Sequence, residues 1–508
     1  MGFKTWIRSI IKSQITMQIL KFFVTICFVA VAQHASSQIH FYHIYTNNGY
    51  DFGEGITQLP DSSYLITGSS SSFGDAPAQA FILHVDSLGN YMWSKSYGGS
   101  ESDWGRRIFH VPNDGIYVAG YSNSFGNNAF DFYFFKTDVQ GNLIYQKNYG
   151  GTKREKLFGA VMLPDTTFIL VGETASTDNE LEDIFMMRLN AVGDTLWTKQ
   201  MGSSAGVDRA RNVAVLNDTT VLVVGDYFDT DSLMQKAFMM KLNIDGTYQW
   251  FKWFGNNQEF SLNDVTINNG MVRAVGYNKR TNPTGTENSY LYRWIGDTHG
   301  NPTFQLIDDI VNYSKLDYIT SYGNQGKFYV VEQATDVPTP TFGIGEDCLI
   351  QRYTDYLFWD NGLLNTSNLG QDQGNQIIPT SDGGAIMVGY NTSYGKGGNN
   401  VTLVKIGPND TYPESYTAPI ENQLVFTEEL KAAFKLAIYP NPTSDQLQIT
   451  TDLTESLNYM LVDISGKLIV QNSFYSHEII SMASLQSGIY LLQVGTNQHQ
   501  QTVRIVKK

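Results

Sequence analysis

A short apolar motif that ends in glycine recurs along the chain at a nearly constant interval. Its copies read YLITGS, IYVAGY, FILVGE, VLVVGD, VRAVGY and IMVGY, and their glycines are Gly68, Gly120, Gly172, Gly225, Gly276 and Gly389. The intervals are 52, 52, 53, 51 and finally 113 residues. The last interval covers two periods, and its midpoint falls on KFYVVEQ, where Glu332 replaces the glycine. Seven copies of a unit this long indicate a solenoid or a propeller.

Each copy carries the signals of four short strands. A first strand ends in a turn such as LPDSS, the glycine strand follows, and a third strand such as AFILHVD leads through DSLGN to a fourth, YMWSKSYGG. Asn, Asp and Gly supply the turn chemistry between them. Charged residues make up 16% of the chain and aromatic residues 13%, a composition that favours an all-β fold. Four strands per period predict the blades of a β-propeller.

The first copy is preceded by an isolated fourth strand. Phe41 lies one period before Trp93, although no earlier strands precede it, and the seventh copy has three clear strands. We therefore expect residues 39–45 to complete the seventh blade and to close a seven-bladed β-propeller over residues 38–410. An open ring would leave a strand edge exposed to aggregation.

The segment before the repeats has the pattern of a signal peptide, residues 1–37. It holds four basic residues and no acid, then the apolar run FFVTICFVAVA and small residues before Gln38. A run this short is typical of a signal peptide, and a retained membrane anchor is the alternative. We expect cleavage before Gln38, with translation starting at Met1 or Met17, and no integral membrane segment afterwards.

Charge and cysteine content exclude several classes of partner and site. The net charge is −15, and removing the four positive charges of the signal peptide leaves −19. Such an acidic chain argues against nucleic acid and anionic membranes as partners. Cys27 leaves with the signal peptide, so Cys348 is the one remaining thiol. Neither an intrachain disulfide nor a cysteine-based metal site is expected.

The period ends after residue 410. Residues 411–434 have the composition of a linker with one short helical stretch, and residues 435–508 alternate strand and turn signals. Such alternation in a short segment predicts a small Ig-like β-sandwich. An ordinary adhesion-type sandwich has the same composition.

The C-terminal segment carries a series of short motifs. They are formed by Tyr439, Pro440, Asn441, Pro442, Gly466, Lys467, Leu485, Ser487, Gly488, Ile489, Tyr490, Lys507 and Lys508. In this series the chain resembles the type A C-terminal sorting domain of the type IX secretion system. The resemblance implies export across both membranes, with the secretion machinery and its C-terminal signal peptidase as partners. The cargo is then secreted or attached to lipopolysaccharide at the outer cell surface.

The repeat has a resemblance of its own. Its pattern of GG, DGG, AGY and YGG elements is similar to an extracellular propeller repeat common in Bacteroidetes proteins. That resemblance implies a fold and no fixed activity, because propellers host enzymes, lectins and scaffolds alike.

Charged residues recur at fixed places in the repeat. A basic or imidazole side chain recurs on the third strand, as His84, Lys136, Arg188, Lys241, Arg293, Arg352 and Lys405. An acid recurs at the start of the unit, as Asp51, Asp103, Glu155, Asp208 and Asp372. Residues repeated in every blade favour a structural role, so we expect hydrogen-bond or ion pairs here. A ring of catalytic carboxylates is the weaker alternative.

Two familiar motifs of catalytic and cofactor sites are absent from the sequence. It has no H-E-x-x-H pair and no Rossmann glycine set. His40 and His43 are an odd number of residues apart on a strand, so they point to opposite faces and cannot share a metal. We therefore expect no cofactor and no metal, and we assign no catalytic residue.

Ligand binding is expected where the repeat is broken. The fifth and sixth copies have longer loops, and YTDYLFWDNGLL replaces the usual turn. This region offers aromatic faces for a sugar and carboxylates that accept hydrogen bonds, namely Tyr353, Tyr356, Trp359, Asp347, Asp355 and Asp360. Alternatively, these aromatic side chains fill the blade core, where aromatic residues dominate packing.

These observations favour a secreted or cell-surface binding protein over an enzyme, with a glycan or a protein as ligand. An extracellular hydrolase or lyase acting on a polysaccharide is the main alternative, and a structural role in the envelope is another. Two convergent carboxylates with raised pKa values in a pocket would favour the enzyme. An exposed aromatic platform without such a pair would favour binding.

Overall fold

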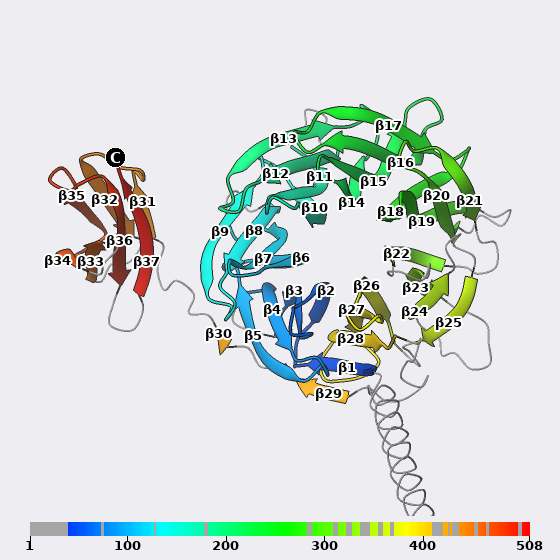
Figure 1. Ribbon diagram of the computed structural model, residues 1–508, viewed down its shortest axis with the longest axis horizontal. Coiled ribbons are helices and arrows are strands. Elements are labelled where there is room, and N and C mark those ends of the chain that lie inside the picture. The colour runs from blue at the N-terminus through cyan, green and yellow to red at the C-terminus, as the bar shows by residue number, and fades with distance from the viewer. Residues whose placement is uncertain are drawn as a thin grey trace, which may run out of the picture.

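The computed structural model describes residues 39–508 except for the segments 73–75, 126–128, 177–180, 282–286, 308–312, 322–327, 336–345, 354–358, 366–369, 409–419, 425–426, 429–435, 452–455, 464–466 and 496–499. Within the described residues all the regular elements are strands. Most of them belong to sheets arranged around a common axis, which Figure 1 shows end on. This radial arrangement is a β-propeller.

In each of these sheets the first strand lies nearest the axis and its successors follow outward (Figure 1). Four sheets, each of four successive strands, come first: β2 (Asp51–Gln58), β3 (Tyr64–Ser70), β4 (Gln79–Val85) and β5 (Tyr91–Tyr97); β6 (Asp103–Val111), β7 (Gly115–Ser122), β8 (Asp131–Thr137) and β9 (Leu143–Tyr149); β10 (Glu155–Met162), β11 (Phe168–Thr174), β12 (Asp183–Leu189) and β13 (Thr195–Met201); β14 (Arg209–Asn217), β15 (Thr220–Asp229), β16 (Met234–Asn243) and β17 (Tyr248–Phe254).

The next strands are joined into one larger sheet, and a further set of three follows it. They are β18 (Glu259–Asn268), β19 (Met271–Thr281), β20 (Glu287–Asp297), β21 (Pro302–Ile307), β22 (Tyr313–Ser321), β23 (Phe328–Thr335), β24 (Glu346–Tyr353) and β25 (Trp359–Asn365), then β26 (Asp372–Pro379), β27 (Ala385–Asn391) and β28 (Asn400–Ile406). β20 pairs with β21 from Tyr292 to Gly296 and with β22 through one residue pair, Ser289 with Tyr313. That single pair accounts for the merged sheet.

A β-bulge interrupts the innermost strands at equivalent places. In β2, Gly53 pairs with Gly68 and Gly55 pairs with Thr67, so Glu54 has no residue opposite it. The bulges of β6, β10, β14, β18 and β26 leave a corresponding set without opposite residues, namely Arg106, Phe158, Arg211, Asn263 and Asn375. A bulge bends the strand and redirects the extra side chain. These side chains therefore come from equivalent points around the axis.

The recurring glycine is explained by the same feature. A Cβ atom on Gly68 would lie 1.7 Å from the Phe52 carbonyl oxygen, and one on Gly120 would lie 1.7 Å from the Trp104 carbonyl oxygen. The second strand thus passes so close to the bulged first strand that no side chain fits. The repeated glycines are a steric requirement of the inner sheet.

The strand β1 (Phe41–Thr46), from the N-terminal end of the propeller region, pairs with strands from its C-terminal end. It pairs antiparallel with β28 and in parallel with β29 (Ile420–Gln423). β30 (Thr427–Glu428) pairs in parallel with β5 in the neighbouring sheet. Within the predicted linker the described residues therefore include two strands, because the outer edges of these sheets have free hydrogen-bonding groups that an extended segment can use.

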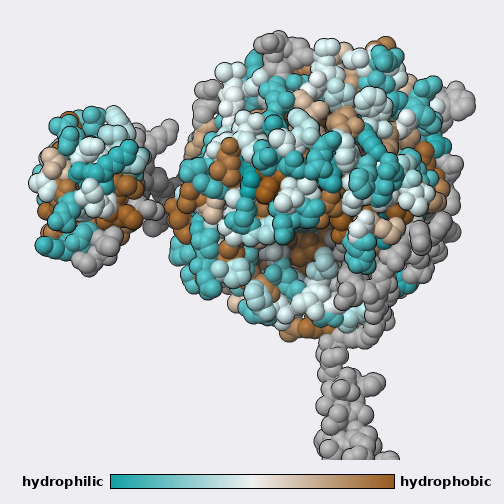
Figure 2. Space-filling view, turned by 45° about the horizontal axis from the view of Figure 1, so that its top comes forward, coloured by the Kyte–Doolittle hydropathy of each residue, from teal (hydrophilic) through white to brown (hydrophobic). Residues whose placement is uncertain are grey.

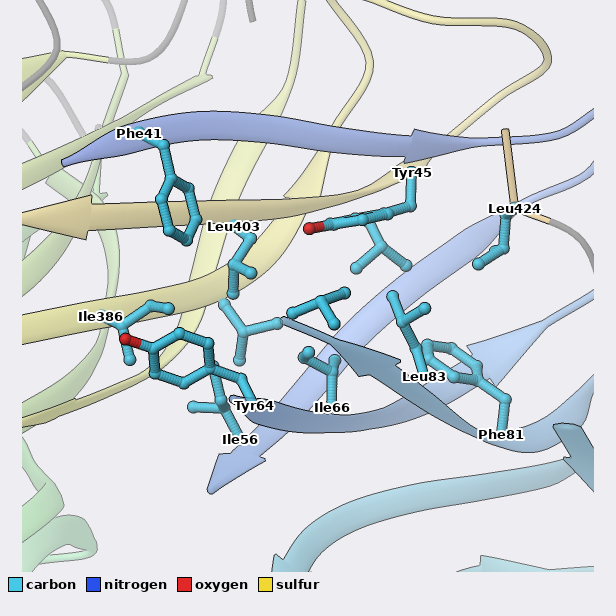
Figure 3. Packing of buried hydrophobic residues seen from close by; sticks show 13 residues of the cluster. Phe41, Tyr45, Ile56, Tyr64, Ile66, Phe81, Leu83, Ile386, Leu403 and Leu424 are labelled. Carbon is cyan, nitrogen blue, oxygen red and sulfur yellow. The ribbon is translucent and has the colours of Figure 1, made fainter. Parts of the chain in front are cut away.

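An apolar cluster lies against one face of β1, as Figure 3 shows. Phe41 and Tyr45 pack with Leu403 of β28 and with residues of β3 and β4. Leu424, which follows β29, is fully buried in the same cluster. Its backbone N–H donates to the Thr46 carbonyl oxygen at 2.9 Å. The linker thus contributes a core residue to the propeller.

The C-terminal strands form two smaller sheets with one shared core. The first sheet has the order β31 (Leu436–Tyr439), β32 (Gln446–Thr451) and β35 (His477–Ser481); the second has the order β34 (Leu468–Phe474), β33 (Leu457–Asp463), β36 (Gly488–Gly495) and β37 (Gln500–Lys507). Leu447 and Ile449 of the first sheet pack with Leu461 and Leu492 of the second. The segment therefore has a hydrophobic core of its own.

Candidate functional site

A cavity of about 330 Å³ lies on the propeller axis. Its lining includes the six bulge residues, namely Glu54, Arg106, Phe158, Arg211, Asn263 and Asn375. The other lining residues are Phe52, Trp104, Tyr121, Lys156, Gln373 and Tyr390. Figure 2 shows a face of the ring that is hollowed, with hydrophobic surface inside the hollow. We refer to this space as the axial cavity.

Aromatic rings form one part of the wall of the axial cavity. The rings of Trp104 and Tyr121 are stacked, with centroids 5.8 Å apart and an interplanar angle of 14°. Phe52 lies 5.4 Å from Trp104 and meets Tyr390 edge to face at 5.0 Å. This wall is a continuous aromatic surface of the kind on which ring-shaped ligands stack.

Two arginines of the cavity have carboxylate partners. Arg106 forms an ion pair with Glu54, whose side chain is almost fully buried. Arg211 donates through Nε to Asp226 at 2.7 Å, and its guanidinium lies over the Phe158 ring at 5.1 Å. Burial raises the pKa of Asp226, but both Arg211 and Arg209 lower it, and the net direction is downward. These arginines are held in place by charged partners on neighbouring strands.

Lys156 is the third cation of the cavity, and it has no hydrogen-bond or ion-pair partner among the described residues. Its Nζ lies 5.4 Å from the centroid of Tyr121 and 5.7 Å from that of Phe158. Burial lowers the pKa of Lys156, and the positive charge of Arg106 lowers it further, while Glu173 and Glu54 oppose the shift. Lys156 is thus a cation held against aromatic faces and poorly hydrated.

Amide side chains form another part of the wall. Asn375 donates through Nδ2 to the Gly53 carbonyl oxygen at 2.8 Å and accepts a hydrogen bond of 2.8 Å from Gln373. The hydroxyl of Tyr390 donates to Gln373 Oε1 at 2.9 Å. This chain of hydrogen bonds fixes the orientation of the amides, which leaves a preorganised polar surface toward the cavity.

Of the ligand residues predicted from the sequence, the structure describes the side chain of Tyr353. Tyr353 is 2% exposed and packs among buried residues, and its ring lies 5.0 Å from the Arg293 guanidinium. The remaining residues of that set lie outside the described side chains, namely Tyr356, Trp359, Asp347, Asp355 and Asp360. Tyr353 therefore contributes to the core of its sheet, and the binding role of the set stays a prediction.

The recurring acids are structural groups, but their partners differ from the expected third-strand bases. The buried carboxylate of Asp51 accepts hydrogen bonds from the hydroxyls of Ser70 and Ser72, and Asp103 accepts from Ser122 and Ser124. Burial raises the pKa of both acids to about 6, although these hydrogen bonds lower it. The sequence showed that these acids recur, but pairing them with the third-strand bases was wrong.

Three of the third-strand bases, Lys136, Arg188 and Lys405, reach acids in the turn between the first two strands of the same sheet. Lys136 pairs with Asp114 at 2.6 Å, and Lys405 pairs with Asp382 at 2.9 Å. The hydroxyl of Ser63 lies 3.0 Å from Nε2 of His84, the equivalent residue in the first copy. These bases therefore fasten a turn, and they do not face the axis.

The residues of the axial cavity could not be predicted from the repeat pattern, because the bulge position holds a different type of side chain from one unit to the next. The bulge position holds Glu, Arg, Phe, Arg, Asn and Asn in successive described strands. The neighbouring positions of the unit repeat from copy to copy. Variation at this one position was therefore the sequence signal that could have indicated the cavity. A repeated scaffold that varies at one inward-facing position has the pattern of a binding site.

The motif residues of the C-terminal segment converge at one end of its two sheets. Asn441 Oδ1 accepts a hydrogen bond of 2.9 Å from the backbone N–H of Val506. Gly488 is the Cα partner of Lys507, and Lys508 donates its backbone N–H to the Thr443 carbonyl oxygen at 2.8 Å. Three motifs that are far apart in the sequence thus form one surface.

The other motif residues have varied surroundings. Tyr439 is 48% exposed and precedes two X–Pro bonds in the cis form, at Pro440 and Pro442. Ile489 is exposed, whereas the hydroxyl of buried Tyr490 donates to the Gln486 carbonyl oxygen at 2.9 Å. Gly466 lies outside the described residues, and the adjacent Lys467 donates its N–H to Asp463 at 3.1 Å.

Comparison with known proteins identifies this C-terminal segment. Residues 437–508 match the family model of the secretion system C-terminal sorting domain. The convergent motifs above belong to that domain, and its presence indicates that the chain is secreted. No curated protein matches the chain.

Solved structures with a similar fold have low sequence identity. The Neurospora crassa Pan2 WD40 domain is 10% identical, with a TM-score of 0.42, over 72% of this chain and 99% of its own. The polysaccharide lyase Uly1 is 10% identical, with a TM-score of 0.43, over 70% of this chain and 90% of its own. The β-propeller domain of the Pyrococcus furiosus Trilobed protease is 8% identical, with a TM-score of 0.42, over 74% and 100%. Similarity at this level says nothing of activity.

Two features are absent from the described residues, a membrane-spanning helix and a metal-binding cluster. Within these residues we find no helix whose length and apolar character would let it cross a membrane. The same residues contain no group of three or more His, Cys, Asp and Glu side chains placed to hold a metal ion.

Proposed function

We propose that this chain is an exported binding protein whose propeller holds a small ligand in the axial cavity. The proposal comprises a signal peptide (1–37), a seven-bladed propeller (38–410) closed by β1, a linker (411–434) and a type IX sorting domain of Ig-like form (435–508). Export to the medium or the outer cell surface follows from the sorting domain. The ligand is expected to be a glycan or a comparable small molecule.

The observation that carries the binding proposal is the set of bulge residues. Six innermost strands place their unpaired residue in one cavity, and these residues differ in chemistry while the scaffold around them repeats. A volume of about 330 Å³ lies at the lower end of the range of small-ligand sites, about 300–1,000 Å³. The cavity suits a small molecule or the end of a chain and is too small for a folded protein.

A hydrolase is less well supported by the same geometry. Glycosidases commonly use two carboxylates on either side of the scissile bond. The described lining of the axial cavity holds one carboxylate, Glu54, and that group is in an ion pair with Arg106. Mature protein incubated with polysaccharides should therefore release no new reducing ends or unsaturated products. Their release, with loss in a Trp104→Ala variant, would overturn the binding assignment in favour of a hydrolase or lyase.

The location of binding is tested by a pair of tryptophan variants on a glycan array. Trp104 lies in the axial cavity, and Trp253 is 58% exposed on the outer strand β17. We expect the mature chain, residues 38–508, to bind array components, Trp104→Ala to lose that binding, and Trp253→Ala to retain it. Binding that depends on Trp253 and is independent of Trp104 would overturn the axial site. Absence of binding to every array component would overturn the glycan-binding function itself.

A further inference from the structure

The axial cavity carries positive charge in a protein that is strongly acidic overall. The chain has a net charge of −15, yet the described lining of the cavity has three cations, Arg106, Lys156 and Arg211, and one carboxylate, Glu54. A cleft lined by one sign of charge concentrates ligands of the other sign. The cavity therefore attracts anionic ligands, although the net charge of the whole molecule is negative.

The three cations are not equivalent, because two have fixed carboxylate partners. Arg106 pairs with Glu54, and Arg211 pairs with Asp226 at 2.7 Å. Lys156 has neither a hydrogen bond nor an ion pair with any described residue, and its described contacts are the rings of Tyr121 and Phe158. The uncompensated charge of the cavity is therefore located on Lys156.

The nearest acid to Lys156 along the sheet is already engaged. Glu173 is the Cα partner of Lys156 across the β10–β11 ladder. Its two carboxylate oxygens accept from other cations, Arg209 Nε at 2.9 Å and Arg154 Nη2 at 3.2 Å. Glu173 is consequently shared by two arginines, and the ammonium of Lys156 lies against the rings of Tyr121 and Phe158.

A partly desolvated ammonium next to another cation is an unfavourable arrangement unless an anion is added. Burial and the charge of Arg106 both lower the pKa of Lys156, so its charged form is disfavoured relative to that of a lysine in water. An anionic group bound near Nζ would restore the lost solvation and offset the repulsion from Arg106. Ligands that place an anionic group near Lys156 Nζ are therefore favoured over neutral ligands.

The remaining surfaces fit a polyhydroxylated ring. The stacked pair of Trp104 and Tyr121 presents an aromatic face next to Lys156. Asn263, Gln373 and Asn375 line the cavity with amide groups that can donate to and accept from hydroxyls. A saccharide has apolar C–H faces for the rings, hydroxyls for the amides and, when acidic, a charge for the lysine.

We infer that the ligand of the axial cavity is an acidic saccharide, with its anionic group at Lys156 and its sugar ring on the wall formed by Trp104 and Tyr121. This inference rests on the proposed binding function and narrows it to a ligand class. The anionic group is a carboxylate or a sulfate ester, since a lysine acts as a point charge and imposes no planar geometry on its partner.

Isothermal titration calorimetry of the mature chain, residues 38–508, with defined oligosaccharides tests the inference. The probes are oligogalacturonate, its methyl ester, sulfated dextran oligosaccharides and unmodified dextran oligosaccharides. The methyl ester keeps the ring and removes the charge. We expect an acidic probe to bind at least about tenfold more tightly than its neutral counterpart, because a hydrogen bond to a charged group is worth about 1.5–3 kcal/mol. Comparing the affinities of the two acidic probes then shows whether the cavity prefers a carboxylate or a sulfate group.

Three variants show whether the preference arises at Lys156. Lys156→Gln should weaken binding of the acidic probe by about tenfold to a hundredfold and leave the neutral probe unchanged. Lys156→Arg should stay within a few-fold of the original affinity. Lys199→Gln is the matched control, since Lys199 also lies over an aromatic ring, that of Tyr248 at 5.3 Å, but on the outer strand β13.

The outcomes separate this inference from the proposed function. Equal affinity for acidic and neutral probes, lost in Trp104→Ala, would overturn the acidic class and leave the axial site standing. An acidic preference unaffected by Lys156→Gln would overturn the assigned position of the anion. Absence of binding to every acidic and neutral saccharide, on the array as in the calorimeter, would overturn both.

Discussion

At the scale of single residues, the glycine of the second strand is determined by the backbone of the first. The Trp104 carbonyl oxygen occupies the position that a Cβ of residue 120 would need. The atom in the way belongs to the backbone of a bulged strand, so it cannot move as the end of a flexible side chain would. Any larger residue must push the two innermost strands of the sheet apart.

Replacing Gly120 by alanine should therefore destabilise the propeller. We expect Gly120→Ala to lower the free energy of unfolding by about 3 kcal/mol, the upper part of the range for overpacked sites, as measured by denaturant titration. Gly270→Ala is the control, because a Cβ there meets nothing within 4 Å and costs the positive-φ penalty alone, about 1–2 kcal/mol. Equal losses in the two variants would contradict the steric explanation.

The buried acids give the propeller an unusual dependence on pH. Burial raises the pKa of Asp103 to about 6 from 3.8, although Gly99 N–H and Ser124 donate to it at 2.8 and 2.7 Å. Between these two pKa values the folded protein holds a proton that the unfolded chain has released, so this group adds stability as pH falls from about 7 toward about 4. The difference corresponds to about 2–3 kcal/mol.

The contribution of Asp103 can be isolated by comparing Tm at two pH values. The wild-type chain should gain stability from this group between about pH 7.5 and about pH 5, and Asp103→Asn should lack that part of the gain. The asparagine variant cannot titrate, so the change in the pH dependence reports the one group. A variant with the wild-type pH dependence would contradict a raised pKa at this position.

At the scale of strands and sheets, the sequence predicted the repeating elements but not the site. Four strands per unit follow from turn residues such as Asn and Gly and from apolar runs, which are local signals, and the glycine column marked the second strand. The bulge that leaves Arg106 and Phe158 unpaired depends on the register between strands. No local preference specifies it, and therefore the inward-facing column was not recognised.

The linker gives a second example of what local patterns miss. Its residues lack a strong strand pattern, yet Ile420–Gln423 pairs with β1, and Leu424 is buried with Phe41 and Tyr45. The free edge of β1 supplies the hydrogen bonds, and an apolar recess between neighbouring sheets accepts the leucine (Figure 3). Both features exist only after the propeller has formed.

Leu424→Ala should accordingly destabilise the propeller although it lies in the predicted linker. Truncating a fully buried leucine costs about 2–5 kcal/mol, so a clear fall in Tm is expected. Ile420→Ala in the preceding strand β29 is the control, because Ile420 is 58% exposed and its truncation should change the stability by less than about 0.5 kcal/mol. Equal and small effects would show that this segment does not contribute to the propeller core.

At the scale of the whole molecule, binding and export are assigned to separate segments with separate cores. The axial cavity uses side chains from the propeller strands, whereas residues 437–508 have their own apolar cluster and their own convergent motif surface. The sequence identified the second segment because its motifs are short, ordered and specific. It could not identify the ligand, since the cavity is assembled from strands spread over about 340 residues, from Phe52 to Tyr390.

Removing the sorting domain should consequently block export without abolishing folding of the propeller. On the proposed export route, recognition of this domain is needed to cross the outer membrane, so we expect a chain that lacks residues 435–508 to accumulate in the periplasm. We also expect it to keep the near-ultraviolet circular dichroism of packed aromatic residues. Cell fractionation with immunoblotting measures the location. Tyr475→Ala is a control, since Tyr475 is 67% exposed and lies outside the motifs, so this variant should be exported normally. Appearance of the truncated chain in the medium or on the cell surface would show that the propeller itself carries an export signal.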